Sequence, residues 1–171
     1  MIALTTPPRL APPTTRVRVS YLTGEQADSV HRGRDTDWLA DAARDFDGFV
    51  ADRVGVRERW GVPSEVFWFT SDEHYIGSLV VRHEPPEDDL GGHIGYHVVR
   101  PWHRRGHATE MLRQATVIAR GLGIDRLLLT VEEDNGPSLR VIEKNGGVHD
   151  GRNPDGQLRL WIDTASVPSD G

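Results

Sequence analysis

The chain has 171 residues, of which 37% are hydrophobic and 27% charged, and its formal net charge is -6. This composition excludes a disordered protein, and a chain of this length builds one well-buried core. Cysteine is absent from the sequence, which excludes a disulfide framework. The negative charge argues against nonspecific nucleic-acid binding, and no apolar run approaches the length of a membrane span. We therefore expect one cytoplasmic domain that binds neither nucleic acid nor membrane.

The first segment, residues 1–14, is rich in Pro and Thr, which predicts an extended or disordered arm. A single domain is expected over residues 15–163, and the polar residues 164–171 are expected to form a flexible tail. At the start of the domain, Arg16–Tyr21 alternates between polar and apolar residues, as a first strand does.

The segment from Thr36 to Asp52 has apolar residues at helical spacing, which predicts an amphipathic helix. Its apolar residues are Trp38, Leu39, Ala42, Phe46, Phe49 and Val50. Such a helix either covers the core or, with the loop before it, forms one wall of an acceptor pocket.

Two strands are expected at Glu65–Thr70 and Tyr75–Arg82, where β-branched and aromatic residues are frequent. The residues between them, Ser71–His74, have the composition of a hairpin turn, so the strands should pair antiparallel. An acidic segment follows at Glu84–Asp89. A solvated loop is its usual fate, and contact with a basic substrate is the alternative.

The stretch Gly91–Thr109 reads as a strand, a basic glycine-containing turn and the start of a helix. A helix N-terminus presents backbone N–H groups and partial positive charge to an anion. Gly106 and Ala108 let the backbone approach that anion closely, and Arg104 and Arg105 add charge beside it. The stretch has neither the Walker pattern nor the three-glycine dinucleotide pattern, which disfavours a nucleotide-binding protein. It therefore predicts a pyrophosphate site of another kind.

The second half of the chain predicts a helix, a buried strand, a helix and a last strand. An apolar stripe from Met111 to Leu122 indicates the first helix, and the nearly continuous apolar run Arg126–Val131 indicates a strand covered on both faces. Strand, helix and strand in this order imply a parallel crossover. The next helix begins near Pro137 and stops at Asn145–Gly147, and Gln157–Ile162 alternates as a strand does.

Two motifs resemble those of the GCN5-related N-acetyltransferases (GNAT). His103–Ala108 is similar to the Gln/Arg-x-x-Gly-x-Gly/Ala loop that binds acetyl-CoA in this family, with His in the first position. Glu132–Ser138 resembles the family's Asn-x-x-Ala/Ser element. The resemblance implies an α/β fold of mixed α+β type, a splayed mixed β-sheet of about seven strands flanked by about four helices.

The resemblance also implies which residues hold acetyl-CoA. Backbone groups at the end of the fourth family strand bind the thioester and pantetheine, the loop binds the pyrophosphate, and the Asn and small residue face the pantetheine arm. In this sequence the corresponding residues are Val98, Val99, His103, Arg104, Arg105, Gly106, His107, Ala108, Thr109, Asn135 and Ser138. Asn135 is also suited to cap a helix, and the imidazoles of His103 and His107 either contact phosphate or are simply exposed.

The chemistry needs a base for the acceptor amine. His93 stands about where many family members carry a Glu, and a neutral imidazole suits the role. The alternative for His93 is a structural hydrogen bond. His97, four residues on, should share its strand face at about 13 Å, which is too far for both to ligate one metal ion.

The chemistry also needs a proton for the leaving thiolate. Family members often use a Tyr late in the helix after the Asn, where this chain has Ile142. Ser138, Tyr96 or a water can replace it, or the thiolate leaves unassisted.

These features predict an N-acetyltransferase that transfers the acetyl group of acetyl-CoA directly to a primary amine, without a metal. The acceptor is a small-molecule or peptide amine that the sequence does not identify, and the protein is a monomer or homodimer. The alternative is a noncatalytic acyl-CoA-binding sensor or interaction module on the same fold, favoured by the missing Tyr at Ile142.

Overall fold

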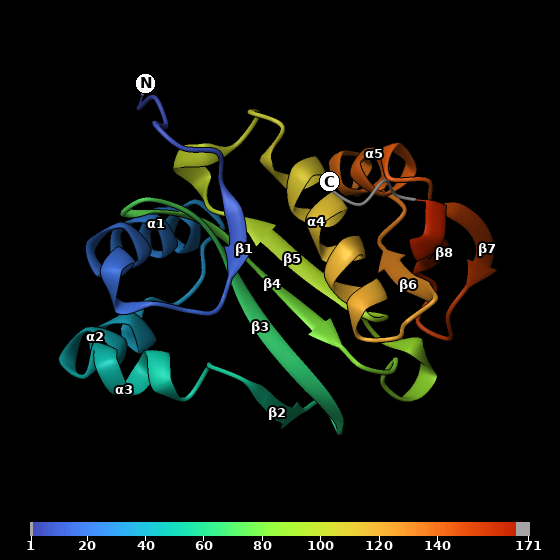
Figure 1. Cartoon of the computed structure of the whole chain (residues 1–171), viewed down its shortest axis with the longest axis horizontal. Helices are drawn as coiled ribbons and strands as arrows, with labels where there is room; N and C mark the ends of the chain where they lie inside the picture. The colour runs from blue at the N-terminus through green and yellow to red at the C-terminus, as the bar shows by residue number, and fades with distance from the viewer. Residues whose placement is uncertain (1, 167–171) are drawn as a thin grey trace.

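The computed structural model describes residues 2–166, in which eight strands form two antiparallel sheets and five α-helices pack around them (Figure 1). The first sheet has the order β1-β3-β4-β5, with β2 paired to β3, and the second has the order β6-β8-β7. The first sheet consists of β1 (Arg9–Ala11), β2 (Val56–Arg59), β3 (Val62–Ser71), β4 (His74–Arg82) and β5 (Ile94–Val98). The second consists of β6 (Arg126–Val131), β7 (Val148–Arg152) and β8 (Leu158–Asp163).

The helices follow the chain in two groups. Those before the hairpin are α1 (Arg18–His31), α2 (Asp37–Arg44) and α3 (Phe46–Ala51), and those after it are α4 (His107–Gly121) and α5 (Gly136–Lys144). Four short 3-10 turns are η1 (Thr15–Val17), η2 (Glu87–Asp89), η3 (Arg100–Trp102) and η4 (Thr164–Ser166).

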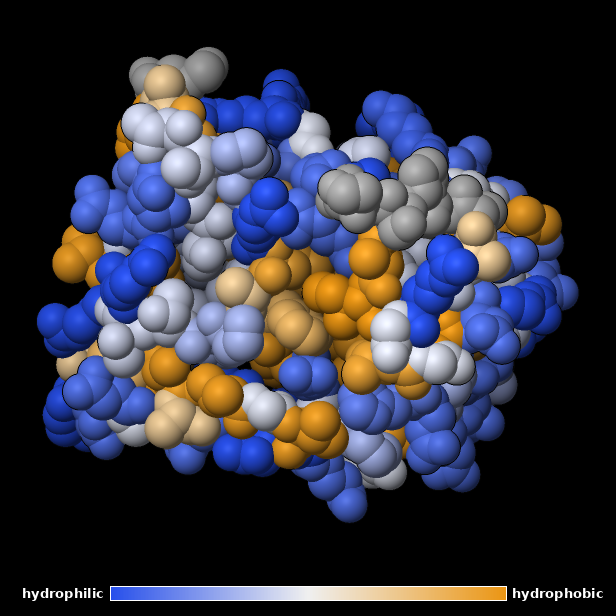
Figure 2. All heavy atoms as spheres, viewed as in Figure 1, coloured by the Kyte–Doolittle hydropathy of each residue, from blue (hydrophilic) through white to orange (hydrophobic). Residues whose placement is uncertain are grey.

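α1 and α4 cover opposite faces of the first sheet. Trp68 of β3 stacks on Tyr21 of α1 at 4.4 Å between ring centroids, whereas the neighbouring Phe69 faces His107 of α4 at 6.0 Å. Adjacent residues of a strand point to opposite faces, so the two rings place the two helices. Figure 2 shows hydrophobic side chains gathered over β4, β5 and α4 in the middle of one face, with hydrophilic ones around them.

Two hydrogen bonds join the two sheets just before β5 begins. The backbone N–H of His93 donates to Leu128 O, and the N–H of Leu128 donates to His93 Nδ1, both at 2.8 Å. β5 and β6 are edge strands of different sheets and share no ladder. The predicted splayed architecture is therefore confirmed, with β5 and β6 as the separating strands and α4 as the crossover between them.

The β3–β4 hairpin and, from α4 onward, α4, β6, α5 and β8 agree with the sequence prediction, whereas β7 was not predicted. The strand predicted at Arg16–Tyr21 is wrong. These residues form η1 and the first turn of α1. Val17 and Tyr21 are buried and lie four residues apart, whereas Val19 is 74% exposed. The apolar spacing is therefore helical, and six residues were too few to separate it from a strand.

The helix predicted from Thr36 to Asp52 is interrupted. At Asp45 the backbone leaves the helical region, and its carboxylate accepts a hydrogen bond from Gly48 N at 3.0 Å, which caps α3. Within the predicted N-terminal arm, Arg9–Ala11 is extended and pairs with β3 as β1. The predicted tail begins with η4, and residues 167–171 lie outside the described residues.

The close contact between the sheets predicts a strict need for glycine at position 92. Gly92 has a φ of +59°, and a Cβ atom there would lie 2.3 Å from Leu128 O. Gly146 also has a positive φ, of +86°, but a Cβ there meets nothing within 4 Å. We expect Gly146→Ala to cost about 1–2 kcal/mol from backbone strain alone, and Gly92→Ala to cost clearly more. Thermal denaturation of the two variants checks this, and equal losses would contradict the close approach.

Candidate functional site

The predicted anion cradle is built by a sharp turn between η3 and α4. Arg104 and Gly106 have φ values of +61° and +78°, and Gly106 is the N-cap residue of α4. Its helix therefore begins without a side-chain cap, which leaves the first N–H groups for another acceptor. A Cβ at Gly106 would meet nothing within 4 Å, so the space over the turn is open. This is the geometry that a helix N-terminus offers to a phosphate.

The charged side chains of the cradle differ in what holds them. Arg104 is exposed, whereas Arg105 lies 4.7 Å over the ring of Trp102 and donates to Ile2 O at 3.1 Å. Burial, and then the charge of Arg105, lower the pKa of His107. The imidazole is therefore neutral near neutral pH, and the arginines supply the positive charge. Ala108 and Thr109 follow in the first turn of α4, where Thr109 O accepts from Asn145 Nδ2 of the loop after α5 at 3.2 Å.

The two predicted backbone contacts at the end of β5 have different surroundings. Val99 N donates to Ile76 O at 3.0 Å, and Val99 O accepts from Trp102 N at 2.9 Å, so both groups are already used. Backbone groups of adjacent strand residues point in opposite directions, so those of Val98 face away from β4. Val98 O accepts a hydrogen bond from His103 Nε2 at 2.6 Å.

His103 also lies near an unsatisfied carboxylate oxygen. Asp28 of α1 is buried, and its Oδ1 atom has no hydrogen-bond partner among the described residues. The distance from His103 Nε2 to this oxygen is 3.8 Å, while Asp28 Oδ2 is paired with Arg32 Nε at 2.7 Å. His103 therefore has a second acceptor within a small movement of its ring.

Tyr96 and Ser138 are brought together from β5 and α5. Their hydroxyl groups are hydrogen-bonded at 2.8 Å. Burial raises the pKa of Tyr96, so its hydroxyl keeps its proton. Asn135 Oδ1 accepts from Ser138 N at 3.3 Å and caps α5, which confirms its capping role. Ile142, in the same helix, is 1% exposed and belongs to the core.

His93 is 7% exposed and acts as the contact between the sheets described above. Because Nδ1 accepts from Leu128 N–H, the neutral ring carries its proton on Nε2. Burial lowers the pKa of His93 from 6.5 to about 4, which Asp89 opposes only in part. The prediction that His93 and His97 share a strand face is wrong, because His93 precedes β5 and turns toward Leu128 of β6, whereas His97 faces Glu25 of α1.

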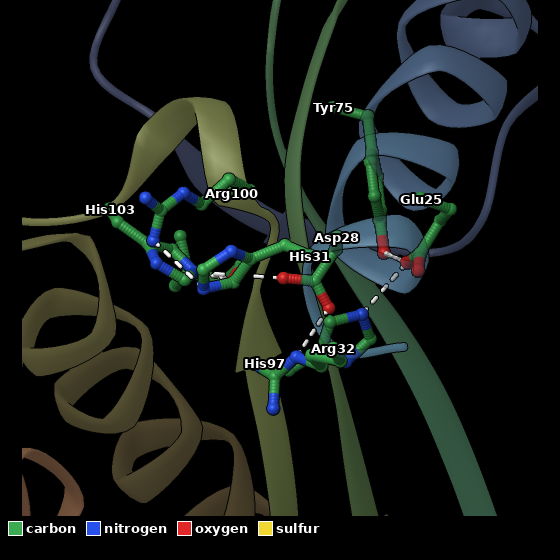
Figure 3. A network of polar contacts seen from close by, with 9 residues as sticks. Glu25, Asp28, His31, Arg32, Tyr75, His97, Arg100 and His103 are labelled. Atoms are coloured by element: carbon green, nitrogen blue, oxygen red, sulfur yellow. Dashed lines mark hydrogen bonds and ion pairs between the residues drawn. The ribbon is translucent and has the colours of Figure 1, made fainter. Parts of the chain in front are cut away.

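A polar network between α1, β4 and β5 was not predicted (Figure 3). Glu25 of α1 accepts from Tyr75 OH at 2.6 Å, and its Oε1 atom lies 2.8 Å from His97 Nε2. Figure 3 shows Glu25 and Asp28 directed from α1 toward the histidines of β5 and the following loop. The helical spacing of Val17, Tyr21, Glu25 and Asp28 is the sequence feature that indicates this network. It is missed when Arg16–Tyr21 is interpreted as a strand.

Other predicted features lie around this network. A hollow of about 380 Å³ separates α1 from α2, on the side where an acceptor pocket was expected. It is lined by Leu22, Gln26, Thr36, Leu39, Ala40 and Ala43. In the acidic segment, Asp89 pairs with Arg159 of β8 at 3.2 Å. Within residues 2–166 no helix is long and apolar enough to span a membrane, and no group of three or more His, Cys, Asp or Glu is arranged to hold a metal ion.

Residues 17–148 match the family described as the Acetyltransferase (GNAT) domain. No protein among the curated ones matches significantly. Solved structures with the same fold include RimJ of Mycobacterium smegmatis in complex with CoA-disulfide, at 18% identity and a TM-score of 0.68 over 96% of this chain and 89% of that chain.

Two further structures are similar at comparable identity. The GNAT domain of S. lividans PAT has 18% identity and a TM-score of 0.62 over 91% of this chain and 90% of that chain. AAC(6')-Ib in complex with ribostamycin and coenzyme A has 16% identity and a TM-score of 0.59 over 96% of this chain and 98% of that chain. AAC(6')-Ib is an aminoglycoside acetyltransferase, whereas RimL is a ribosomal L7/L12 alpha-N-protein acetyltransferase with the same fold, at 16% identity and a TM-score of 0.62 over 95% of this chain and 98% of that chain. The shared fold therefore does not identify the acceptor.

The environment of His93 predicts a pH-dependent loss of stability. Its pKa is about 4 in the folded chain, against 6.5 as the ordinary value, so the unfolded chain takes up a proton that the folded chain does not. The stabilisation is complete above pH 6.5 and is lost as the pH falls toward 4, by up to about 3 kcal/mol. Urea denaturation between pH 7.5 and 4.5 measures it. His93→Gln should show a shallower decline over this window, and an identical slope would remove His93 as its cause.

Proposed function

This chain belongs to the GNAT family of acetyl-CoA-dependent N-acetyltransferases, and we propose that it transfers the acetyl group directly to a primary amine, using the cradle at Gly106 and the strand β5. The observation that carries the proposal is the uncapped start of α4, open above Gly106 and next to the separation of β5 from β6. No covalent intermediate is needed, because the chain has no cysteine and the amine itself is a nucleophile. We place the enzyme in the cytoplasm and expect a small-molecule or peptide acceptor.

In the proposed complex, the first N–H groups of α4 and the exposed Arg104 bind the pyrophosphate of acetyl-CoA. Arg105 adds charge from its place over Trp102. Asn135 and Ser138 lie at the start of α5, beside the same separation of the sheets, where they are suited to contact the pantetheine arm.

The fit of the pantetheine arm is supported by the pair of acceptors around His103. A pantetheine amide N–H that bonds to Val98 O must replace the imidazole now 2.6 Å away. The displaced His103 Nε2 then has Asp28 Oδ1, a buried oxygen without a hydrogen bond, 3.8 Å from its present position. Cofactor binding would thus satisfy a group that is otherwise costly to bury. Val99, whose backbone groups are both used, is assigned to packing instead.

For the leaving thiolate we propose the hydroxyl pair of Tyr96 and Ser138. Tyr96 keeps its proton until the thiolate leaves, because burial raises its pKa, and Ser138 stabilises the resulting phenolate through the same hydrogen bond. The proton that the attacking nitrogen loses then restores the Tyr96 hydroxyl through solvent. This pair makes up for Ile142, which cannot donate. The alternative of a noncatalytic acyl-CoA-binding sensor was based on the absence of a proton donor at Ile142. The hydroxyl pair beside β5 can serve as that donor, so we favour the enzyme.

His93 is given a structural role in this proposal. Its Nδ1 lone pair is held by Leu128 N–H and its Nε2 atom carries the remaining proton, so the neutral ring has no lone pair to offer an amine. The general base for the acceptor amine, which the sequence predicted at His93, must therefore be another residue, and β5 is the place to search.

Filling the cradle predicts loss of cofactor binding. Gly106→Glu places a side chain and a negative charge over the helix N-terminus, and we expect the dissociation constant for acetyl-CoA to rise by at least about 100-fold. Gly156→Glu is the matched control, because its φ of +84° imposes the same backbone strain in a distant turn. Isothermal titration calorimetry measures both. Unchanged affinity in Gly106→Glu would place the cofactor elsewhere.

Removing the hydroxyl of Tyr96 predicts slower turnover with unchanged cofactor binding. General acids contribute about 10²-fold or more to such steps, so Tyr96→Phe should lower kcat by that order. Ser138→Ala should have a smaller effect, because water can replace the second hydroxyl. Release of CoA thiol gives the rate and calorimetry gives the affinity. A Tyr96→Phe variant with wild-type kcat would show that the thiolate leaves unassisted.

A further inference from the structure

Glu25 is a buried carboxylate that the proposed cofactor site does not use. Its residue is 6% exposed, and it lies between α1, β4 and β5. Burial alone raises the pKa of a carboxyl group, but the hydrogen bond and charge of His97, with the hydroxyl of Tyr75, lower the pKa of Glu25 below its ordinary value. Glu25 is therefore ionised at neutral pH, which is costly at a buried position unless its partners are fixed.

These partners fix the tautomer of His97. Tyr75 is fully buried with its pKa raised well above 10, so its hydroxyl donates to Glu25 Oε1. An ionised carboxylate only accepts, so His97 Nε2 must also donate to it. The lone pair of the neutral ring is then on Nδ1, which has no hydrogen-bond partner among the described residues. The His97 side chain is 37% exposed, so the ring that carries this lone pair is partly open to solvent.

His97 also lies at the right place on β5. It immediately precedes Val98, and its side chain points to α1, whereas Tyr96 reaches Ser138 of α5 on the other side of the strand. A proton acceptor and a proton donor thus flank the strand that is proposed to hold the thioester.

We propose that His97 is the general base that removes the proton from the acceptor amine, and that Glu25 is its positioning residue. The inference rests on the proposed acetyl transfer. An acceptor arriving as R–NH₃⁺ gives one proton to His97 Nδ1, which passes it to solvent. The neutral nitrogen attacks the thioester carbon, the C–N bond forms and the C–S bond breaks, and the second nitrogen proton balances the one that the thiolate receives. The products are the amide, CoA thiol and one released proton.

The charges around the pair balance, because two carboxylates and two arginines lie there. Asp28 lies three residues from Glu25 on α1 and Arg32 pairs with Asp28, while Tyr75 faces from β4 and Arg100 and His103 from the segment after β5 (Figure 3). Arg100 NH1 is bonded to His31 at 3.0 Å, at the end of α1. The two buried carboxylates lie on the α1 side of His97, where Arg32 and Arg100 offset their charge.

The kinetic test uses release of CoA thiol from acetyl-CoA between pH 5.5 and 9, with water alone and with spermidine, kanamycin or a tetrapeptide with a free N-terminus. We expect His97→Gln to lower kcat by about 10²-fold or more, to lose the limb that rises with pH, and to keep the acetyl-CoA affinity. Glu25→Gln should keep the limb but lower kcat, because the amide no longer fixes the ring in the tautomer that leaves Nδ1 free. Glu25→Asp should recover part of the wild-type profile. The exposed His149→Gln is the control and should retain the limb.

The protonation of the two ring nitrogens of His97 can be measured directly, and this measurement does not depend on the identity of the acceptor. Nitrogen NMR of the acetyl-CoA complex should show His97 with its proton on Nε2 and a free Nδ1, and Glu25→Gln should weaken this preference. A retained limb in His97→Gln, or a proton on Nδ1, overturns the assignment. If the wild-type protein binds acetyl-CoA but releases no thiol with any acceptor, the proposed function fails, and the NMR result still decides whether Glu25 orients His97.

Discussion

The arrangement of the site depends on one reciprocal contact, the two hydrogen bonds that join His93 and Leu128. They hold the edge of the first sheet to the edge of the second at one point, and beyond it β5 and β6 have no ladder in common. Edge strands normally present unpaired backbone groups that need a partner or cover. Here the backbone groups of Val98 face the gap between the separating sheets, where Val98 O accepts from the His103 ring. The same contact uses an imidazole as a permanent acceptor, which works only while that imidazole is neutral.

The parts of the molecule that could be predicted from the sequence are those that local chain geometry determines. The cradle consists of consecutive residues from Arg104 to Thr109, and a glycine before an apolar helical stripe is enough to indicate it. The β3–β4 hairpin is likewise local, since its turn and its alternating strands lie side by side in the chain. In both cases one short range contains the whole physical reason for the structure.

The parts that could not be predicted depend on contacts between distant segments. Glu25 and His97 are 72 residues apart, and no local pattern says that a helical carboxylate will meet that particular histidine. The short strands β1 and β2 are similar, because pairing with β3 creates them more than their own composition does. For His93 the residue type was informative, but whether an imidazole is a base or a structural acceptor depends on Leu128, which is brought close only by the meeting of the sheets.

His93, just before β5, and His97, within β5, show that position determines the chemistry of the same side chain. His93 accepts from a backbone amide, is buried, and has its pKa lowered to about 4, so it stays neutral with its lone pair already used. His97 donates to an ionised carboxylate through Nε2, and that hydrogen bond leaves the lone pair on the other nitrogen of a partly exposed ring. Both rings are fixed by one hydrogen bond, yet only the second arrangement leaves a lone pair for a substrate. The direction of that hydrogen bond, more than the presence of histidine, therefore assigns the structural and the chemical role along β5.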